Sequence, residues 1–161
     1  MLDLIKACYE LRALEGRRGL GIELGAPDLQ ALASLERLFY GRRALCEGRR
    51  TDWWSKRARR IPARVAVLLR SPQEPGRVTD GVMADLSASG FFVETATRLE
   101  AGAELTVLVR DPNSGWEWHF PARVARASAS GLGLELCGIP IECRHWGQAL
   151  AGLGAEEADA A

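Results

Sequence analysis

Two short motifs carry the side chains of this chain that are best suited to chemistry. Arg60 and Arg64 begin and end the run Arg-Ile-Pro-Ala-Arg, and Asp85, Ser87 and Gly90 belong to Asp-Leu-Ser-Ala-Ser-Gly. An arginine guanidinium binds phosphate oxygens and guanine edges through paired donors, whereas an aspartate with a serine accepts and donates at a base edge. The five residues therefore indicate a binding site for an anionic, base-bearing ligand.

The sequence favours a binding protein over an enzyme. Its carboxylates are scattered among the expected strands and the tail, and no potential nucleophile has a histidine beside it in sequence. No glycine-rich loop leads into an expected helix, as a phosphate-binding loop would. We therefore predict no catalytic residues.

An all-β pattern follows the first motif and places both motifs at the ends of neighbouring strands. Apolar runs alternate with turn formers, and Asp111-Pro-Asn-Ser-Gly115 supplies a hairpin loop. We expect Val82, Ala84 and Leu86 to share one face of the second strand. The expected strands span residues 65–69, 78–86, 91–95, 105–109, 116–120 and 132–136. Short strands joined by turns predict a small antiparallel barrel or sandwich.

Helical spacing marks both ends of the chain. One apolar stripe ends at the glycines that begin with Gly16, and a second begins after Pro27 and closes at Gly41. The first stripe contains Leu4, Cys8, Leu11 and Leu14, and the second contains Leu29, Leu32, Leu35 and Leu38. Two helices this short do not bury both stripes against each other alone, so we expect the β domain or a second copy of the chain to cover them. A closing helix is expected from Ile139 to about Leu150.

The positive charge of the chain is concentrated in one segment. Residues 42–64 hold nine basic and two acidic side chains, although the whole chain has 21 of each. Because this basic run ends in the first motif, it favours the phosphates of a small ligand over a nucleic acid. Trp53 and Trp54 either stack on a purine or anchor the linker on the domain, and anchoring is favoured because the indoles precede Arg60 by six residues or more.

Length, cysteines and hydropathy set further bounds. A chain of 161 residues that is 47% hydrophobic is large enough for one main domain. The cysteines at positions 8, 46, 137 and 143 lack a Cys-x-x-Cys spacing, and Cys143 with His145 supplies two potential ligands, which do not make a site. We therefore expect reduced thiols, no metal and no cofactor. No apolar run is long enough to span a bilayer and the N-terminus lacks the pattern of a signal peptide, so we expect a soluble, cytoplasmic protein.

From about Lys56 to about Leu150 the chain resembles the PilZ domain, the family of bacterial cyclic di-GMP receptors. The family's two motifs, Arg-x-x-x-Arg and Asp/Asn-x-Ser-x-x-Gly, are complete here and are followed by Gly90-Phe-Phe-Val-Glu-Thr95 and Gly131-Leu-Gly-Leu-Glu-Leu136. The resemblance implies a six-stranded antiparallel barrel with a C-terminal helix. Together with the helical stripes, the basic run and the small, acidic tail, it divides the chain into a helical pair at 1–41, a basic linker at 42–60, a β-barrel domain at 61–152 and a flexible tail at 153–161.

The resemblance also assigns roles within the site. Arg60 and Arg64 bind phosphates and guanine edges, while Asp85 and Ser87 bind a guanine or form a local turn, and the two roles are compatible. Gly90 permits either a special backbone conformation or a close ligand approach. In the family, an arginine directly before the first motif implies two stacked ligand molecules per site. Arg59 occupies this position, and Arg57 would reinforce binding of the second molecule.

Family resemblance further implies a switch. An arginine-rich linker that wraps around an anion becomes ordered and reorients whatever precedes it, which here is the helical pair at 1–41. The output would be the placement of these helices against an unidentified downstream protein or in a homodimer. The alternative is a degenerate member that serves as a protein adaptor without nucleotide binding. Such members typically lose motif residues, and none is lost here.

Overall fold

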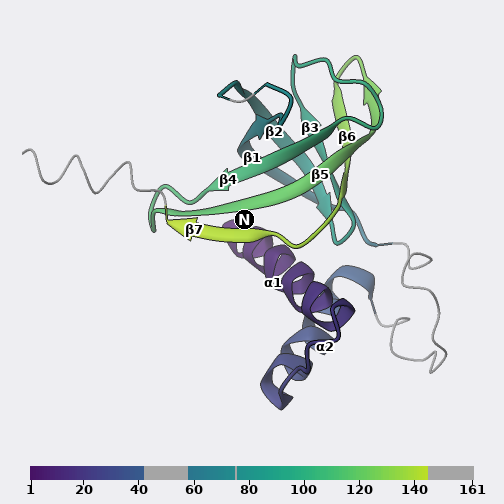
Figure 1. Ribbon diagram of the computed structural model, residues 1–161, viewed down its shortest axis with the longest axis vertical. Coiled ribbons are helices and arrows are strands. Elements are labelled where there is room, and N and C mark those ends of the chain that lie inside the picture. Colours follow the sequence, from purple (N-terminus) through teal and green to yellow (C-terminus); the bar gives the residue numbers. More distant parts are fainter. Residues whose placement is uncertain (42–57, 75, 145–161) are drawn as a thin grey trace, which may run out of the picture.

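The structure, a computed structural model, describes residues 1–41, 58–74 and 76–144 (Figure 1). Most of the expected linker at 42–60, including Trp53, Trp54 and Arg57, lies outside these residues, as do the tail at 153–161 and residues 145–150 of the expected closing helix. The helices are α1 (Leu2–Gly19) and α2 (Ala26–Tyr40). The strands are β1 (Ile61–Arg70), β2 (Val78–Ser87), β3 (Gly90–Glu94), β4 (Glu104–Arg110), β5 (Trp116–Ser128), β6 (Gly131–Leu136) and β7 (Ile141–Arg144).

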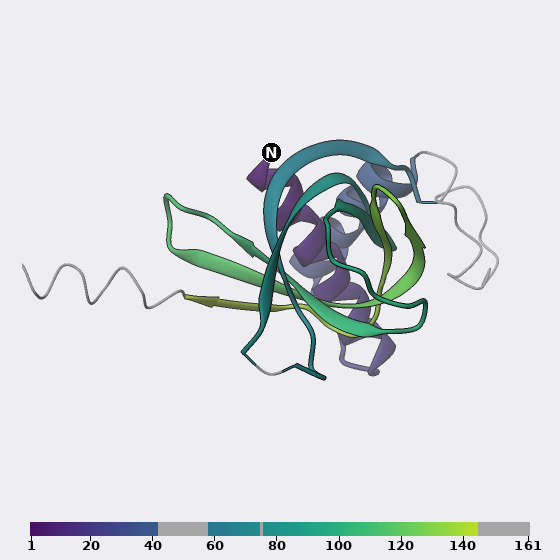
Figure 2. The same cartoon turned by 90° about the horizontal axis from the view of Figure 1, so that it is seen from above.

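Six of the strands close into an antiparallel barrel, which confirms the expected architecture. The strand order is β4-β1-β2-β3-β6-β5, and an additional pairing of β5 with β4 completes the ring. Seen from above, the strands curl around a common axis (Figure 2). Closure leaves no free edge in the ring itself. The motif-bearing ends of β1 and β2 are thereby held on a rigid wall.

The expected closing helix is wrong over Ile141–Arg144, which form β7. This short strand pairs with Trp116–His119 at the beginning of β5. Beside the pairing, the Trp118 indole N–H donates to Glu142 Oε1 at 2.7 Å. Pairing with a strand that is distant in sequence outweighs the local helical spacing, because propensity is only a weak preference.

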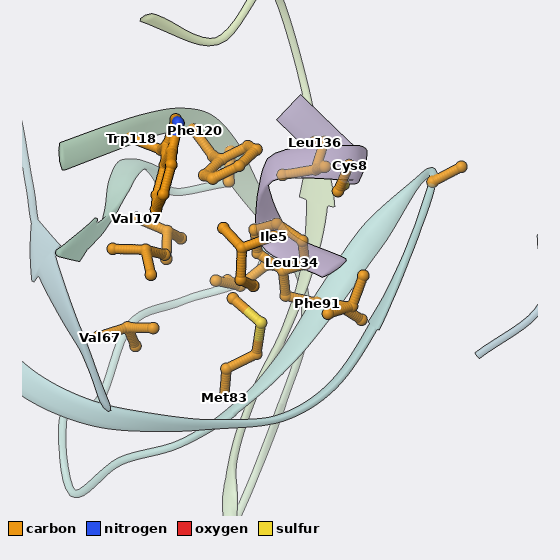
Figure 3. Close-up of a cluster of buried hydrophobic side chains, with 14 of the residues drawn as sticks. Ile5, Cys8, Val67, Met83, Phe91, Val107, Trp118, Phe120, Leu134 and Leu136 are labelled. Atoms are coloured by element: carbon orange, nitrogen blue, oxygen red, sulfur yellow. The ribbon is translucent and has the colours of Figure 1, made fainter. Parts of the chain in front are cut away.

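Helix α1 covers one end of the barrel. Ile5, Cys8 and Leu11 of α1 are fully buried. Figure 3 shows Ile5 and Cys8 among barrel side chains that include Phe91 and Leu136. Burial of a large aliphatic side chain contributes about 1.5–3 kcal/mol, so this stripe anchors the helix firmly. The barrel therefore covers the first apolar stripe. We expected either the β domain or a second copy of the chain to do so.

The first helix is longer than its glycines indicate. It continues through Gly16 and ends at Gly19. A Cβ on Gly16 would lie 2.5 Å from Ile139 Cγ1, so the missing side chain lets the segment after β6 pack against the helix. Tertiary packing at this position outweighs the low helix propensity of glycine.

Helix α2 packs on α1 rather than on the barrel (Figure 1). It begins with Pro27 in its first turn and ends before Gly41, as the sequence predicts. Leu32 and Phe39 are buried, whereas Leu29 and Leu38 remain 52% and 42% exposed. The Tyr40 hydroxyl donates to Glu15 Oε1 at 3.1 Å and joins the two helices at the far end of the stripe.

Replacing Leu32 with alanine should lower the free energy of unfolding by about 2 kcal/mol, because it opens a cavity between α1 and α2. Limited proteolysis and urea denaturation should both detect the loosened helical pair. The matched control is Leu38→Ala on the exposed side of α2, which we expect to change stability by less than about 0.5 kcal/mol. Equal effects of the two substitutions would contradict the assignment of the buried face.

Candidate functional site

The two motifs meet on the outer wall of the barrel. Pro62 of β1 and Asp85 of β2 are cross-strand partners, so Arg60 precedes the strand directly beside the second motif. Its Nη1 donates to Asp85 Oδ1 at 2.8 Å, with the Arg60 side chain 56% exposed and the Asp85 side chain 27% exposed. An exposed pair of this kind contributes little to stability. It does place a guanidinium and a carboxylate side by side where a ligand can reach both.

Strand pairing is irregular beside both motifs. The register of β1 with β2 shifts between Pro62 and Val65, and that of β2 with β3 shifts between Met83 and Asp85. Met83 and Leu86 are both fully buried although they are three residues apart. The bulge therefore changes the inward phase of β2 and leaves Asp85 on the outer face, an effect that bulges commonly have near functional sites.

The same bulge overturns one expectation about β2. Val82, Ala84 and Leu86 do not share a face: Leu86 belongs to the core, while Val82 and Ala84 are partly exposed. The strict alternation of a regular strand does not hold across the extra residue. Val82 and Ala84 consequently contribute to the outer surface next to Arg64.

Arg64 lines a shallow depression on the outer wall. The depression has a volume of about 300 Å³, and its lining includes Pro62, Val82, Ala84 and Glu94. A larger groove of about 890 Å³ shares Arg64 and continues across β1 toward β4. Within the described part of the chain, no acid forms an ion pair with Arg64. The arrangement offers an unpaired cation above an apolar floor.

Ser87 holds the turn between β2 and β3. The backbone N–H of Gly90 donates to Ser87 Oγ at 3.1 Å, and the Ser87 hydroxyl donates to the Gly90 carbonyl at 3.0 Å. The side chain is almost fully buried. The local side-chain-to-backbone turn, one of the two roles expected of this motif, is therefore present.

Gly90 is required by the packing of the barrel. A Cβ at this position would lie 2.1 Å from the Leu134 carbonyl oxygen of β6. Gly90 is not among the residues with positive φ, so a special backbone conformation does not explain the glycine. The glycine therefore permits the close approach of β6 to β3.

The site is tied to the N-terminal helices at two points. The backbone N–H of Arg59 donates to the Phe39 carbonyl at the end of α2 with a distance of 2.8 Å. The Cys8 thiol of α1 donates to the Ser87 carbonyl at 3.7 Å. The residue before the first motif and Ser87 of the second motif therefore contact the helical pair directly, one through each helix.

Sequence reasoning missed two outer-face residues, Phe92 and Arg126. Cross-strand pairing places Asp85, Phe92, Gly133 and Arg126 in one row over β2, β3, β6 and β5. The Arg126 guanidinium lies 5.9 Å from the centroid of the Phe92 ring. Gly133 has no side chain, which leaves room for the stem of Arg126. The row adds an aromatic face and another cation beside the Arg60–Asp85 pair.

A sequence signal existed for only one of the two. Alternation in β3 directs Phe92 outward because Phe91 points into the core, where its ring packs edge-on against Phe120. Arg126 carries no local signal, since its position beside Phe92 depends on the pairing of β5 with β6. Such pairings are not readable from spacing along the chain.

Comparison with known proteins identifies the family of the chain. A family model described as the PilZ domain matches residues 55–149. The chain therefore belongs to the PilZ domain family, whose members are binding or effector domains rather than enzymes. Among solved structures, the PilZ domain of CeSA from a cellulose-synthesizing bacterium is similar: it is 23% identical, with 49% of this chain and 80% of that chain covered and a TM-score of 0.42. No curated protein matches the chain. Neither described helix is long and apolar enough to cross a membrane.

Proposed function

We propose that this chain is a receptor for cyclic di-GMP. The observation that carries the proposal is the Arg60–Asp85 pair, which joins the two motifs on one outward face of the barrel. Cyclic di-GMP presents two phosphodiesters and two guanines. Recognition of it therefore needs forked cations for the phosphates and an acceptor for the base N–H groups.

The side chains of the site divide these tasks. Arg60 and Arg64 bind phosphate oxygens and the acceptor edge of guanine, and Asp85 accepts from the guanine N–H groups. Ser87 and Gly90 act chiefly by shaping the turn that holds Asp85 in place. Phe92 offers an adjacent aromatic surface for a base.

Arg59 sets the number of ligand molecules in this proposal. Its side chain is exposed beside Arg60, where a second, stacked cyclic di-GMP would find another forked cation. We expect the wild type to bind about two molecules per chain and Arg59→Leu to bind closer to one. Calorimetry with protein of known active fraction measures the ratio. A wild-type ratio of one would contradict this part of the proposal.

Ligand binding also changes the placement of the N-terminal helices in this proposal. The Arg59 amide is bonded to the end of α2, so a ligand that draws the Arg59 and Arg60 side chains toward the barrel pulls on that helix. Hydrogen exchange of the Arg59 amide and of α2 should change when cyclic di-GMP is added. The readout downstream is an unidentified protein or a second copy of the chain.

Nucleotide selectivity tests the proposed function. Cyclic di-GMP should bind saturably. Cyclic di-AMP should bind at least tenfold more weakly, since adenine lacks the guanine N–H groups from which Asp85 accepts hydrogen bonds. A competition assay with a fluorescent cyclic di-GMP analogue gives both affinities. The protein-adaptor alternative predicts that neither nucleotide competes. Equal competition by the two nucleotides would contradict the proposal that Asp85 recognises guanine.

A further inference from the structure

A second cluster of reactive side chains lies where β5 and β7 pair, away from the motif face. Glu117 and His119 of β5 and Cys143 of β7 offer one ligand atom each, and these atoms all lie within 4.8 Å of one another. His119 Nε2 is 2.5 Å from Glu117 Oε1 and 3.4 Å from Cys143 Sγ. Carboxylate oxygen, imidazole nitrogen and thiolate sulfur are the donor types that zinc prefers.

Strand geometry brings the three together. Glu117 and His119 are two residues apart on β5, so they share the outer face, while Trp118 between them is buried. Cys143 is the direct cross-strand partner of Glu117. Directly opposed residues on neighbouring strands have adjacent side chains on the same face. The cluster is therefore built into the pairing of β5 with β7.

Glu117 is an unusual residue for this position, because it is a carboxylate that is only 6% exposed. Arg110 of β4 donates to its Oε2, and His119 contacts its Oε1. Arg110 on one carboxylate oxygen therefore orients the Glu117 side chain with Oε1 toward His119 and Cys143.

We propose that Glu117, His119 and Cys143 form a zinc-binding site. In a tetrahedral site with ordinary zinc distances, the nitrogen and sulfur ligands would be about 3.6 Å apart and the nitrogen and oxygen ligands about 3.4 Å apart. The nitrogen–sulfur separation of 3.4 Å is already close to this value. The carboxylate oxygen must move away from Nε2 by about 1 Å, which a small side-chain rotation achieves.

The protons and charges of the site balance. Zinc replaces the proton of the Cys143 thiol, which is released to solvent, and the Nε2 lone pair of His119 becomes a ligand when its proton resides on Nδ1. The thiolate and the carboxylate neutralise the two charges of the ion. Arg110 keeps its hydrogen bond to Oε2 and orients the ligand from outside, as partners of metal-bound carboxylates do. The fourth position is left for water.

Zinc would cross-link β7 to the barrel. Within the described residues, β7 pairs with β5 alone, through four residue pairs. A metal bound from both strands would stabilise this short pairing. Hydrogen exchange in β7 should therefore slow when zinc is bound, a structural readout that is independent of nucleotide binding.

Cobalt spectroscopy and zinc calorimetry test the proposal on the full chain. Purified metal-free protein should bind one zinc ion per chain, and Co²⁺ should produce a thiolate-to-cobalt charge-transfer band. Cys143→Ser should abolish the band and weaken zinc binding at least a hundredfold, and His119→Gln should weaken it at least tenfold. A variant that lacks both Cys46 and Cys137 is the matched control and should retain the band. Absence of one-to-one binding in the wild type, or an unchanged band in a folded Cys143→Ser protein, would overturn the proposal.

Discussion

Replacing Arg64 with alanine should weaken cyclic di-GMP binding about a hundredfold, which corresponds to about 2–3 kcal/mol. The guanidinium lines the outer depression, and no described acid pairs with it, so its removal costs ligand contacts rather than stability. Isothermal calorimetry gives the affinity, and thermal unfolding should show a melting temperature close to that of the wild type.

The matched control for this substitution is Arg77→Ala. Arg77 is an equally charged, exposed residue whose ion pair is with Glu74, away from the two motifs. Its removal changes the net charge by the same amount and should leave cyclic di-GMP affinity within about twofold, because exposed charges act weakly at a distance in salt. A folded Arg64→Ala protein with unchanged affinity would remove Arg64 from the site.

Gly90→Ala should destabilise the barrel by about 3 kcal/mol. The added methyl group would overlap the Leu134 carbonyl oxygen. This oxygen is a backbone atom, so a side-chain rotation cannot relieve the overlap. β3 and β6 must separate locally, and small-to-large changes at packed positions cost on this order. Chemical denaturation should show the lower midpoint.

Gly19→Ala serves as the control for Gly90→Ala. A Cβ on Gly19 meets nothing within 4 Å, and Gly19 ends α1 without a positive φ. The free energy of unfolding of the Gly19→Ala protein should differ from that of the wild type by less than about 0.5 kcal/mol. An unchanged denaturation midpoint for Gly90→Ala would show that β3 and β6 separate at Gly90 without loss of stability, and would contradict the prediction. Loss of ligand binding by this variant reports a damaged barrel as much as a lost ligand contact.

Sequence patterns predicted an antiparallel barrel or sandwich and the proximity of the two motifs, since these follow from local information, and the family resemblance selected the barrel. Alternating apolar residues and turn formers mark the strands, and the antiparallel order of β1 and β2 then brings Arg60 beside Asp85. The bulge at Ala84 was not predictable, because an extra residue disturbs alternation without a compositional mark. It is nevertheless what turns Asp85 toward solvent.

Features that depend on pairing between distant segments escaped the sequence analysis. The expected closing helix proved to be β7 at 141–144, and its partner strand begins at Trp116. His119 and Cys143 are separated by 24 residues, so no ligand spacing along the chain indicates their cluster. The packing that requires a glycine at position 90 likewise involves β6. Only the assembled barrel shows that the Leu134 carbonyl occupies the space that a side chain on residue 90 would fill.

Titration of the wild-type chain with cyclic di-GMP in a calorimeter is the most direct measurement. Our account predicts saturable binding by the folded full chain, with about two molecules per site and a heat signal that Arg64→Ala largely removes. It also predicts that a mononucleotide, guanosine monophosphate, gives no comparable signal at the same concentration, because it carries one base and one phosphate. Absence of saturable heat with cyclic di-GMP, from protein whose barrel is shown to be folded, would contradict the central claim.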